Sequence, residues 1–447
     1  MGRTKRHRSA RRNGERIAEV YDHVDLYQYL KSLGWENHNE LRIGNFRASG
    51  KGLYSKKPIV SGDCIIAMPV DALISLKDIE NNSPFKQHFD LDKLAEMGKC
   101  DVQFQSLLAY YLCYLRIYET SKYKPYLDTL PAQFTAPYFC STKEMSFLPE
   151  TVLKTMVAQN KIIRNNFAAL NSLLKTNIIG LDVELFKWAY FVVNTRSVYL
   201  DPKYIKAYDI DAKWTFAEKL ADEPNMALAP YLDLFNHSES VKTSSRLSMP
   251  YTQLVRKLTK GNQVELFYEL ITTSPFQSYS QIFISYGTHN NTKLLCEYGF
   301  FLENNTHDYL ETSLDEINAF IKHDPELRPL KIQREKYRFI MDHNLEEQLF
   351  FISGDLLSHN LAVCLTILFV EQNIHQLKTI AFGETPSIEP IVDIALRLLS
   401  YKLKEYDACV TGLQNMAGIT TSGSMAVMYL NECIKFLNKI KANLEQL

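Results

Sequence analysis

Hydrophobic residues recur at helical spacing in three parts of the chain. Between Ile17 and Leu33 they predict an amphipathic helix that ends near Gly34. From Val102 to about Trp188 the same periodicity continues through "FQSLLAYYLCYLRIYE" and "LPETVLKTMVAQNKIIRNNFAAL". After Asn305 no strand pattern is evident, and four further segments have helical periodicity: 325–352, 355–379, 389–406 and 424–443.

Short apolar runs of a different kind predict β-strands in two regions. Residues 41–75 contain glycine-punctuated runs such as "GKGLYS" and "CIIAMPV". Short runs return between about 190 and 286, where "LVRKL", "QVELFYEL" and "QIFISYG" read as strands. The chain is therefore predicted to hold two β-rich regions that are separated by a helical insert.

This layout predicts the domain organisation. A chain of 447 residues is too long for one ordinary core. We expect an α+β domain over residues 17–305, with a helical insert at about 95–190, followed by a helical domain over residues 306–447. Residues 1–16 lie outside both domains.

The first sixteen residues form a basic tail that we expect to be disordered. They contain a single acidic residue and seven basic ones: Arg3, Lys5, Arg6, Arg8, Arg11, Arg12 and Arg16. Such a tail is typical of a nuclear-localisation or nucleic-acid-contacting arm, and equally of a solvated extension that aids solubility. It is not followed by the apolar core of a secretory signal peptide.

Two further counts exclude classes of protein. The longest apolar run spans ten residues (361–370), about half of what a membrane helix needs, so no membrane contact is expected. None of the eight cysteines stands in CxxC or zinc-site spacing, so we expect no metal site and a reducing, intracellular compartment. They are Cys64, Cys100, Cys113, Cys140, Cys296, Cys364, Cys409 and Cys433.

Four short stretches carry the candidate chemistry. They are "SGKGL" (49–53), "VVNTRSVYL" (192–200), "DLFNHS" (233–238) and "ISYGTHNNTKLLCEYGF" (284–300). Each alone is an ordinary turn or strand end. In this order and spacing they resemble the SET-domain methyltransferases, and more narrowly the subgroup of the Rubisco large-subunit lysine methyltransferase. That resemblance implies a SET-domain β-fold with a pseudoknot-like crossing and a helical insert, followed by an all-helical C-terminal domain.

The resemblance also implies a site for S-adenosylmethionine. Asn236 would contact the amino-acid end of that cofactor, and His237 would place backbone groups on its adenine. Ser49 and Lys51 would flank it through main-chain contacts, while Gly50 and Gly52 lack a Cβ and allow a close approach. Arg196 offers a planar fork suited to the cofactor carboxylate, and its alternative is a surface ion pair.

Two tyrosines match the catalytic positions of the family. Tyr286 would align the acceptor amine and contact the transferred methyl group as well as the cofactor. Tyr298, in "EYGF", would wall the channel that admits a lysine side chain. Tyr251 is the nearest counterpart of a third channel tyrosine, although its spacing departs from the family pattern.

The expected function is S-adenosylmethionine-dependent N-methylation of lysine in histones or other proteins. The partner would be a protein substrate that presents a lysine, with chromatin contact through the basic tail and a location in nucleus and cytoplasm. Two alternatives remain open: a protein-histidine methyltransferase, which shares this architecture, and a catalytically silent SET-type binding module. Nucleic-acid binding is a weaker alternative, because the basic residues lack interleaved aromatic residues.

Overall fold

The computed structural model describes residues 18–19, 23–118, 122–207, 214–329, 332–383 and 386–447. The predicted basic tail, residues 1–16, lies outside these ranges. The chain divides into two compact units: a first unit of residues 1–133 and 160–288, and a second unit of residues 134–159 and 289–447. The division falls before Asn305 and gives the middle of the helical insert to the second unit.

Helix α9 (Glu150–Ser172) explains why the insert is divided between the units. Near its N-terminus Val152 and Met156 are buried in the hydrophobic core of the second unit. From Asn160 onward the helix belongs to the first unit. Hydrophobic periodicity predicts a long helix such as α9 well. It does not show at which residue the helix stops contributing to one hydrophobic core and begins contributing to another.

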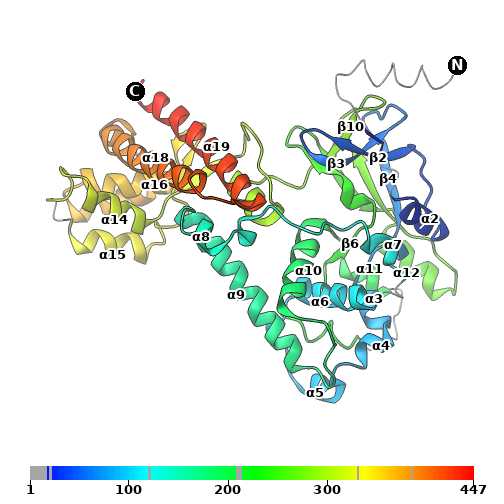
Figure 1. Ribbon diagram of the computed structural model, residues 1–447. Helices are drawn as coiled ribbons and strands as arrows, with labels where there is room; N and C mark the ends of the chain where they lie inside the picture. The colour runs from blue at the N-terminus through cyan, green and yellow to red at the C-terminus, as the bar shows by residue number, and fades with distance from the viewer. Residues whose placement is uncertain (1–17, 20–22, 119–121, 208–213, 330–331, 384–385) are drawn as a thin grey trace. The chain divides into compact units, whose positions relative to one another are not determined.

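The first unit contains the main sheet (Figure 1). Its five strands lie in the order β1 (Ala18–Glu19), β2 (Leu41–Phe46), β3 (Gly50–Ser55), β10 (Gln281–Ile284) and β7 (Asn236–His237). The predicted helix from Ile17 begins only at Val24, because Ala18 and Glu19 pair with Asn45 and Gly44 of β2. The sheet thus gathers the two predicted β-rich regions, although 180 residues (56–235) separate β3 from β7 in sequence.

Two smaller sheets complete the β-structure of this unit. One has the order β4 (Cys64–Pro69), β9 (Phe267–Thr272) and β8 (Thr243–Leu247), and the other pairs β5 (Ser197–Tyr199) with β6 (Met226–Leu228). The predicted strand "LVRKL" is wrong. It lies in helix α12 (Tyr251–Thr259), where Leu254 is fully buried against Val70 and Leu266. The apolar positions of α12 repeat at helical spacing, and five residues were too few to show this.

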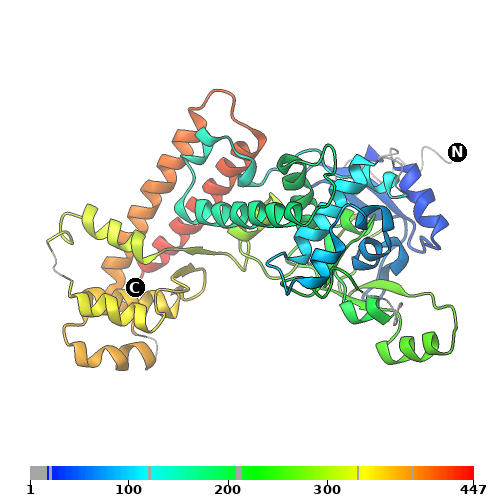
Figure 2. The ribbon, with the colours of Figure 1, turned by 90° about the horizontal axis from the view of Figure 1, so that it is seen from below.

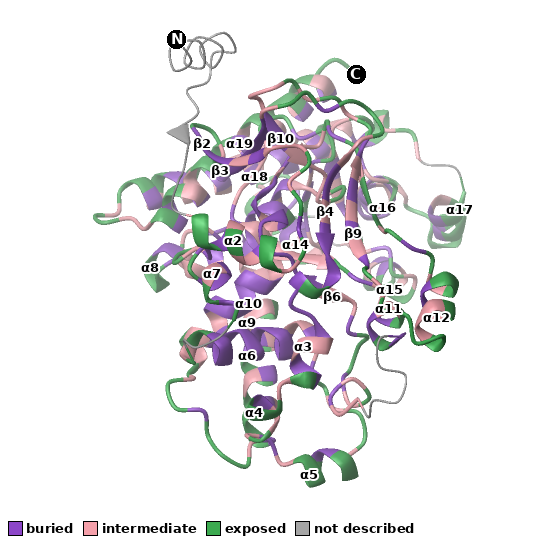
Figure 3. Ribbon diagram, turned by 90° about the vertical axis from the view of Figure 1, so that its right-hand side faces the viewer, coloured by how far each residue is buried: buried purple, intermediate pink, exposed green. Residues whose placement is uncertain are grey.

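Two helices of the insert, α6 (Phe104–Ile117) and α10 (Val183–Arg196), are largely buried. Figure 3 shows α6 and α10 mostly in the colour of buried residues, and the two helices pack against each other. The helices of the first unit, besides α9 and α12, are α2 (Val24–Ser32), α3 (Leu76–Asn81), α4 (Ser83–Lys86), α5 (Leu91–Glu96), α6 (Phe104–Ile117), α7 (Lys124–Leu127), α10 (Val183–Arg196) and α11 (Pro202–Ala207).

The second unit is mainly helical, as the periodicity after Asn305 predicts. Its two longest helices, α18 and α19, lie side by side in Figures 1 and 2. In the part of the chain that the structure describes, no helix is both long and apolar enough to cross a membrane. The α-helices of this unit, apart from α9, are α8 (Thr142–Met145), α13 (Asn291–Lys293), α14 (Leu314–His323), α15 (Arg334–Asp342), α16 (His359–Leu365), α17 (Leu377–Phe382), α18 (Val392–Gln414) and α19 (Thr421–Leu444).

A small sheet accompanies these helices and was not predicted. Strands β11 (Tyr309–Glu311), β12 (Phe350–Ile352) and β13 (Leu356–Leu357) pair antiparallel. Strands of two or three residues are too short to show the alternation by which a strand is recognised in sequence. The predicted helical segment 325–352 accordingly contains helix only over Arg334–Asp342 and ends in β12.

A buried ion pair joins two helices within the second unit. Lys402 of α18 and Glu316 of α14 lie 2.8 Å apart, and their side chains are only 1% and 7% exposed. Glu316 also accepts hydrogen bonds from Thr312 and from the amide of Ser313, which caps α14. The buried negative charge of Glu316 is therefore compensated only when the ammonium of Lys402 is present.

Replacing Lys402 by methionine should lower the free energy of unfolding by about 3–5 kcal/mol, because Glu316 would keep a buried charge without its cation. Lys404→Met is the matched control, since Lys404 is exposed on the same helix and its loss should change stability by less than about 0.5 kcal/mol. Urea denaturation measures both variants. Equal stability of the two variants would contradict this account of the pair.

Candidate functional site

The NHS and YG motifs meet in the first unit through a parallel strand pair. Phe283 pairs with Asn236 and Ile284 with His237, and the amide of Ser238 donates to the carbonyl of Ile284 at 3.1 Å. Among the strands that the structure describes, β7 and β10 form the one parallel pair. This pairing confirms the crossing that the sequence predicts.

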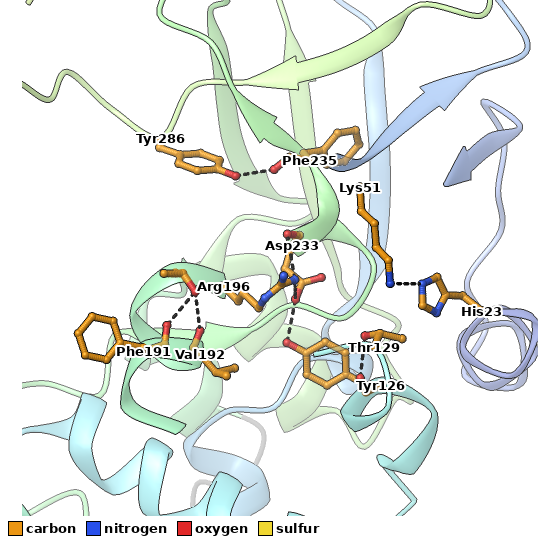
Figure 4. Close-up of polar contacts among 11 residues, drawn as sticks. His23, Lys51, Tyr126, Thr129, Phe191, Val192, Arg196, Asp233, Phe235 and Tyr286 are labelled. Atoms are coloured by element: carbon orange, nitrogen blue, oxygen red, sulfur yellow. Dashed lines mark hydrogen bonds and ion pairs between the residues drawn. The ribbon is translucent and has the colours of Figure 1, made fainter. Parts of the chain in front are cut away.

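Tyr286 follows β10 and is held by the segment around β7. Its amide N–H donates to Nδ1 of His237 at 3.1 Å, and its ring stacks on the imidazole with centroids 5.1 Å apart. Its hydroxyl donates to the carbonyl of Phe235 at 2.5 Å (Figure 4). Nδ1 of His237 also lies 3.3 Å from the carbonyl oxygen of Ile284. The phenol is therefore fixed at both its ring and its hydroxyl.

Asn236 joins the NHS motif to the glycine motif. Its Nδ2 donates to the carbonyl of Lys51 at 2.9 Å and lies 3.5 Å from the carbonyl of Ser49. Gly52 explains why the motif needs glycine: a Cβ there would lie 2.8 Å from Nδ2 of Asn236. Gly50 has a φ of +70°, a conformation that glycine adopts without strain.

Gln281 belongs to the same cluster, and sequence reasoning missed it. Its side chain is buried, its Oε1 accepts from the hydroxyl of Ser49 at 2.9 Å, and a Cβ on Gly52 would lie 2.5 Å from its Nε2. That Nε2 has no hydrogen-bond partner among the described residues. The one hint in the sequence was a glutamine at the start of a predicted strand, and glutamines are too common in such positions to identify a site.

Arg196 ends helix α10 and forms a buried ion pair. Its Nη1 lies 3.0 Å from Oδ2 of Asp233, and the two side chains are 19% and 1% exposed. The hydroxyl of Tyr126 donates to the same Oδ2 at 2.9 Å (Figure 4). Burial raises the pKa of Asp233, and Arg196 and Tyr126 oppose that increase. The sequence left open a surface ion pair for Arg196. The structure shows an ion pair that is buried instead.

These groups line a cavity of about 290 Å³ within the first unit. Its wall includes Lys51, Arg196, Asp233 and Asn236, together with residues 129–132 from the insert. The ammonium of Lys51 lies 3.5 Å from Nε2 of His23. Oδ1 of Asp233 is buried and has no hydrogen-bond partner among the described residues. The cavity is thus lined by a guanidinium and by the carboxylate-bearing residue that pairs with it.

Two other predicted tyrosines belong to other elements of the structure. Tyr298 belongs to the second unit, at the end of a π-helical turn, where burial and then Glu297 raise its pKa to about 12. Tyr251 begins α12 and packs on Tyr204, away from the Tyr286 contacts. The assignment of Tyr251 to a lysine channel is therefore not supported, and the role of Tyr298 stays a prediction.

The site also includes residues that the motifs do not mark. Residues 129–132 line the cavity and Tyr126 donates to Asp233; they lie about 65 to 70 residues before Arg196 in sequence, and only the fold brings them together. All eight cysteines are free, and within the described ranges no group of three His, Cys, Asp or Glu side chains could hold a metal ion. The site therefore consists of charged and polar side chains, main-chain groups, a few apolar residues and the phenols of Tyr126 and Tyr286.

Comparison with known proteins identifies the fold and its relatives. No protein-family model matches the chain. SET domain-containing protein 4 of Homo sapiens is 27% identical over 93% of this chain and 90% of its own length. The actin-histidine N-methyltransferase of Drosophila melanogaster is 27% identical over 75% of this chain and 62% of its own length.

Solved structures agree with this result. The SET domain of LSMT bound to lysine and AdoHcy superposes with a TM-score of 0.60 at 17% identity, covering 95% of this chain and 91% of that one. Rubisco LSMT bound to AdoMet gives a TM-score of 0.59 at 16% identity, covering 96% and 92%. The chain therefore has the SET-domain fold of the Rubisco LSMT structures and is a homologue of SET domain-containing protein 4.

Proposed function

We propose that the protein is an S-adenosylmethionine-dependent protein-lysine N-methyltransferase. The observation that carries the proposal is the cavity in which Arg196 and Asp233 lie beside Asn236 and Lys51, on the motifs that the parallel strand pair brings together. Similarity to structures that contain AdoMet or AdoHcy supports the choice of cofactor.

The charged groups of the cavity fit the amino-acid end of that cofactor. A guanidinium has five N–H donors, and the contacts of Arg196 with Asp233 use Nη1 only, so donors remain for a carboxylate. A guanidinium whose donors are incompletely satisfied within the protein favours a ligand that carries a carboxylate.

The backbone of the glycine motif can approach a ligand closely. Asn236 holds the carbonyl of Lys51, and Gly52 leaves no side chain between the motif and Gln281. We retain Ser49, Gly50, Lys51 and Gly52 as main-chain contacts and Asn236 and His237 as cofactor-binding residues. These assignments remain part of the proposal.

Tyr286 would act on the transferred methyl group. The cofactor, when bound, would supply that group on a sulfonium sulfur, and its transfer to a neutral amine would leave a thioether and a methylammonium that releases one proton to solvent. Because the hydroxyl of Tyr286 donates to Phe235, its oxygen can contact a polarised methyl only as an acceptor. Its fixed position would favour in-line alignment.

The acceptor amine must be neutral before it attacks. A free lysine has a pKa of about 10.4, so roughly one molecule in 2,500 is neutral at pH 7. Enclosure by aromatic groups lowers the pKa of an amine, because burial disfavours its charged form. We propose that Tyr298 contributes to such an enclosure, as the resemblance implies.

A protein-histidine methyltransferase is the second candidate. Relatives named actin-histidine N-methyltransferase support it, while LSMT structures that contain lysine or methyl-lysine support lysine. A catalytically silent module is disfavoured, because Tyr286, Asn236 and Arg196 are all present in the arrangement described. From the basic tail we further propose histones among the substrates, chromatin contact, and a location in both nucleus and cytoplasm.

Gly52→Ala should weaken binding of S-adenosylhomocysteine by about 10-fold, because the new methyl group forces Asn236 and Gln281 away from the motif. Gly98→Ala is the control, since a Cβ there meets nothing within 4 Å. Isothermal titration calorimetry compares the two. Unchanged affinity of a folded Gly52→Ala protein would remove the glycine motif from the proposed site.

Tyr286→Phe should preserve the fold and cofactor affinity and lower kcat about 10²-fold or more. The ring volume is kept, while a hydroxyl that acts mainly in the transition state is lost. Single-turnover kinetics on the identified substrate measure the effect. Wild-type turnover by this variant would mean that Tyr286 is only a packed aromatic residue.

The choice of acceptor is tested by incubating the protein with labelled S-adenosylmethionine and paired peptides that differ only in a central lysine or histidine. We expect label on the lysine peptide, with a rate that rises from pH 7 to pH 9 as more amine becomes neutral. Label on the histidine peptide alone would favour the second candidate.

A further inference from the structure

Tyr126 is a buried residue of the site for which the family motifs give no role. Its side chain is fully buried, and its hydroxyl donates to Oδ2 of Asp233 at 2.9 Å. Burial, followed by the neighbouring charge of Asp233, raises its pKa well above the ordinary value, so it remains a hydrogen-bond donor. Arg196 approaches the same oxygen at 3.0 Å, as Figure 4 shows.

Placing both donors on one carboxylate oxygen has a consequence for the ion pair. An arginine and a carboxylate prefer a bidentate pair, in which two parallel N–H groups meet both oxygens. In this structure Arg196 reaches Asp233 through Nη1 alone, and Oδ1 has no partner among the described residues. With Tyr126 on Oδ2, the guanidinium is not fully used by the pair and keeps N–H donors for a ligand.

The backbone around Tyr126 fixes this arrangement. The carbonyl of Tyr126 accepts hydrogen bonds from the amide of Thr129 at 2.8 Å and from its hydroxyl at 2.7 Å. Thr129 itself lines the cavity. The hydroxyl of Tyr123, the residue before α7, donates to the buried carboxylate of Asp78. The four-residue helix α7 is thus held on both sides of Tyr126.

We infer that Tyr126 is a positioning residue: by occupying Oδ2 of Asp233 it keeps the Arg196–Asp233 pair monodentate, so that the guanidinium retains N–H donors for the carboxylate of the cofactor. The inference rests on the proposed function and deepens it. In this role the phenol acts through Asp233 and does not take part in methyl transfer.

Tyr126→Phe tests the inference, with S-adenosylhomocysteine as the probe in isothermal titration calorimetry on the full chain. The variant should bind the probe about 10-fold more weakly, as expected when a hydrogen bond to a charged group is lost. Tyr110→Phe is the matched control: Tyr110 is equally buried, and its hydroxyl donates to Asn171 at 2.7 Å, outside the cavity. The control should bind like the wild type.

The pH dependence of affinity separates positioning from packing. Arg196 and Tyr126 contact Asp233, while Lys51 lines the same cavity and Tyr286 contributes to the field at Arg196. Loss of the Tyr126 donor disfavours the ionised carboxylate and raises the pKa of Asp233 further. The affinity of Tyr126→Phe should therefore fall at a higher pH than that of the wild type as the solution is acidified.

Three results are decisive. Weaker binding with a shifted pH midpoint in Tyr126→Phe, and neither change in Tyr110→Phe, supports the inference. Equal affinities in all three proteins, or equal losses in both variants with an unshifted midpoint, overturns it and leaves the proposed function intact. Absence of binding by the folded wild type overturns both.

Discussion

The structure of the site depends on the parallel pairing of β7 with β10. Because Phe283 pairs with Asn236 and Ile284 with His237, two segments about 45 residues apart are fixed in register. Register determines which side chain lies where, and a shift of one residue would exchange the two faces of the strand. The contacts of Tyr286 with His237 and Phe235, and of Asn236 with the glycine motif, all follow from this pairing.

The second constraint is electrostatic. Burying a carboxylate and a guanidinium costs free energy that a single contact does not fully offset. In the first unit Asp233 is stabilised by Arg196 and Tyr126, yet one of its oxygens lacks a hydrogen bond among the described residues. In the second unit Lys402, Thr312 and the amide of Ser313 all donate to one oxygen of Glu316. Both buried carboxylates are thus stabilised by a cation together with neutral donors.

Local sequence determined how much could be predicted. Long helices such as α6 and α19 show many periods, and the NHS and YG motifs mark their own positions. The helix over "LVRKL" and the strands β11 to β13 are too short for periodicity to identify. Tyr126 and Gln281 join the site only through the fold, so their residue types alone could not reveal them.

A crystal structure of the full chain with S-adenosylhomocysteine would test most directly whether the strand crossing organises a cofactor site. The account predicts that the ligand occupies the cavity, with its carboxylate on Arg196 and its remaining part along residues 49–52. Binding at another position, or a cavity in which Arg196 and Asp233 have closed into a bidentate pair without ligand, would contradict it.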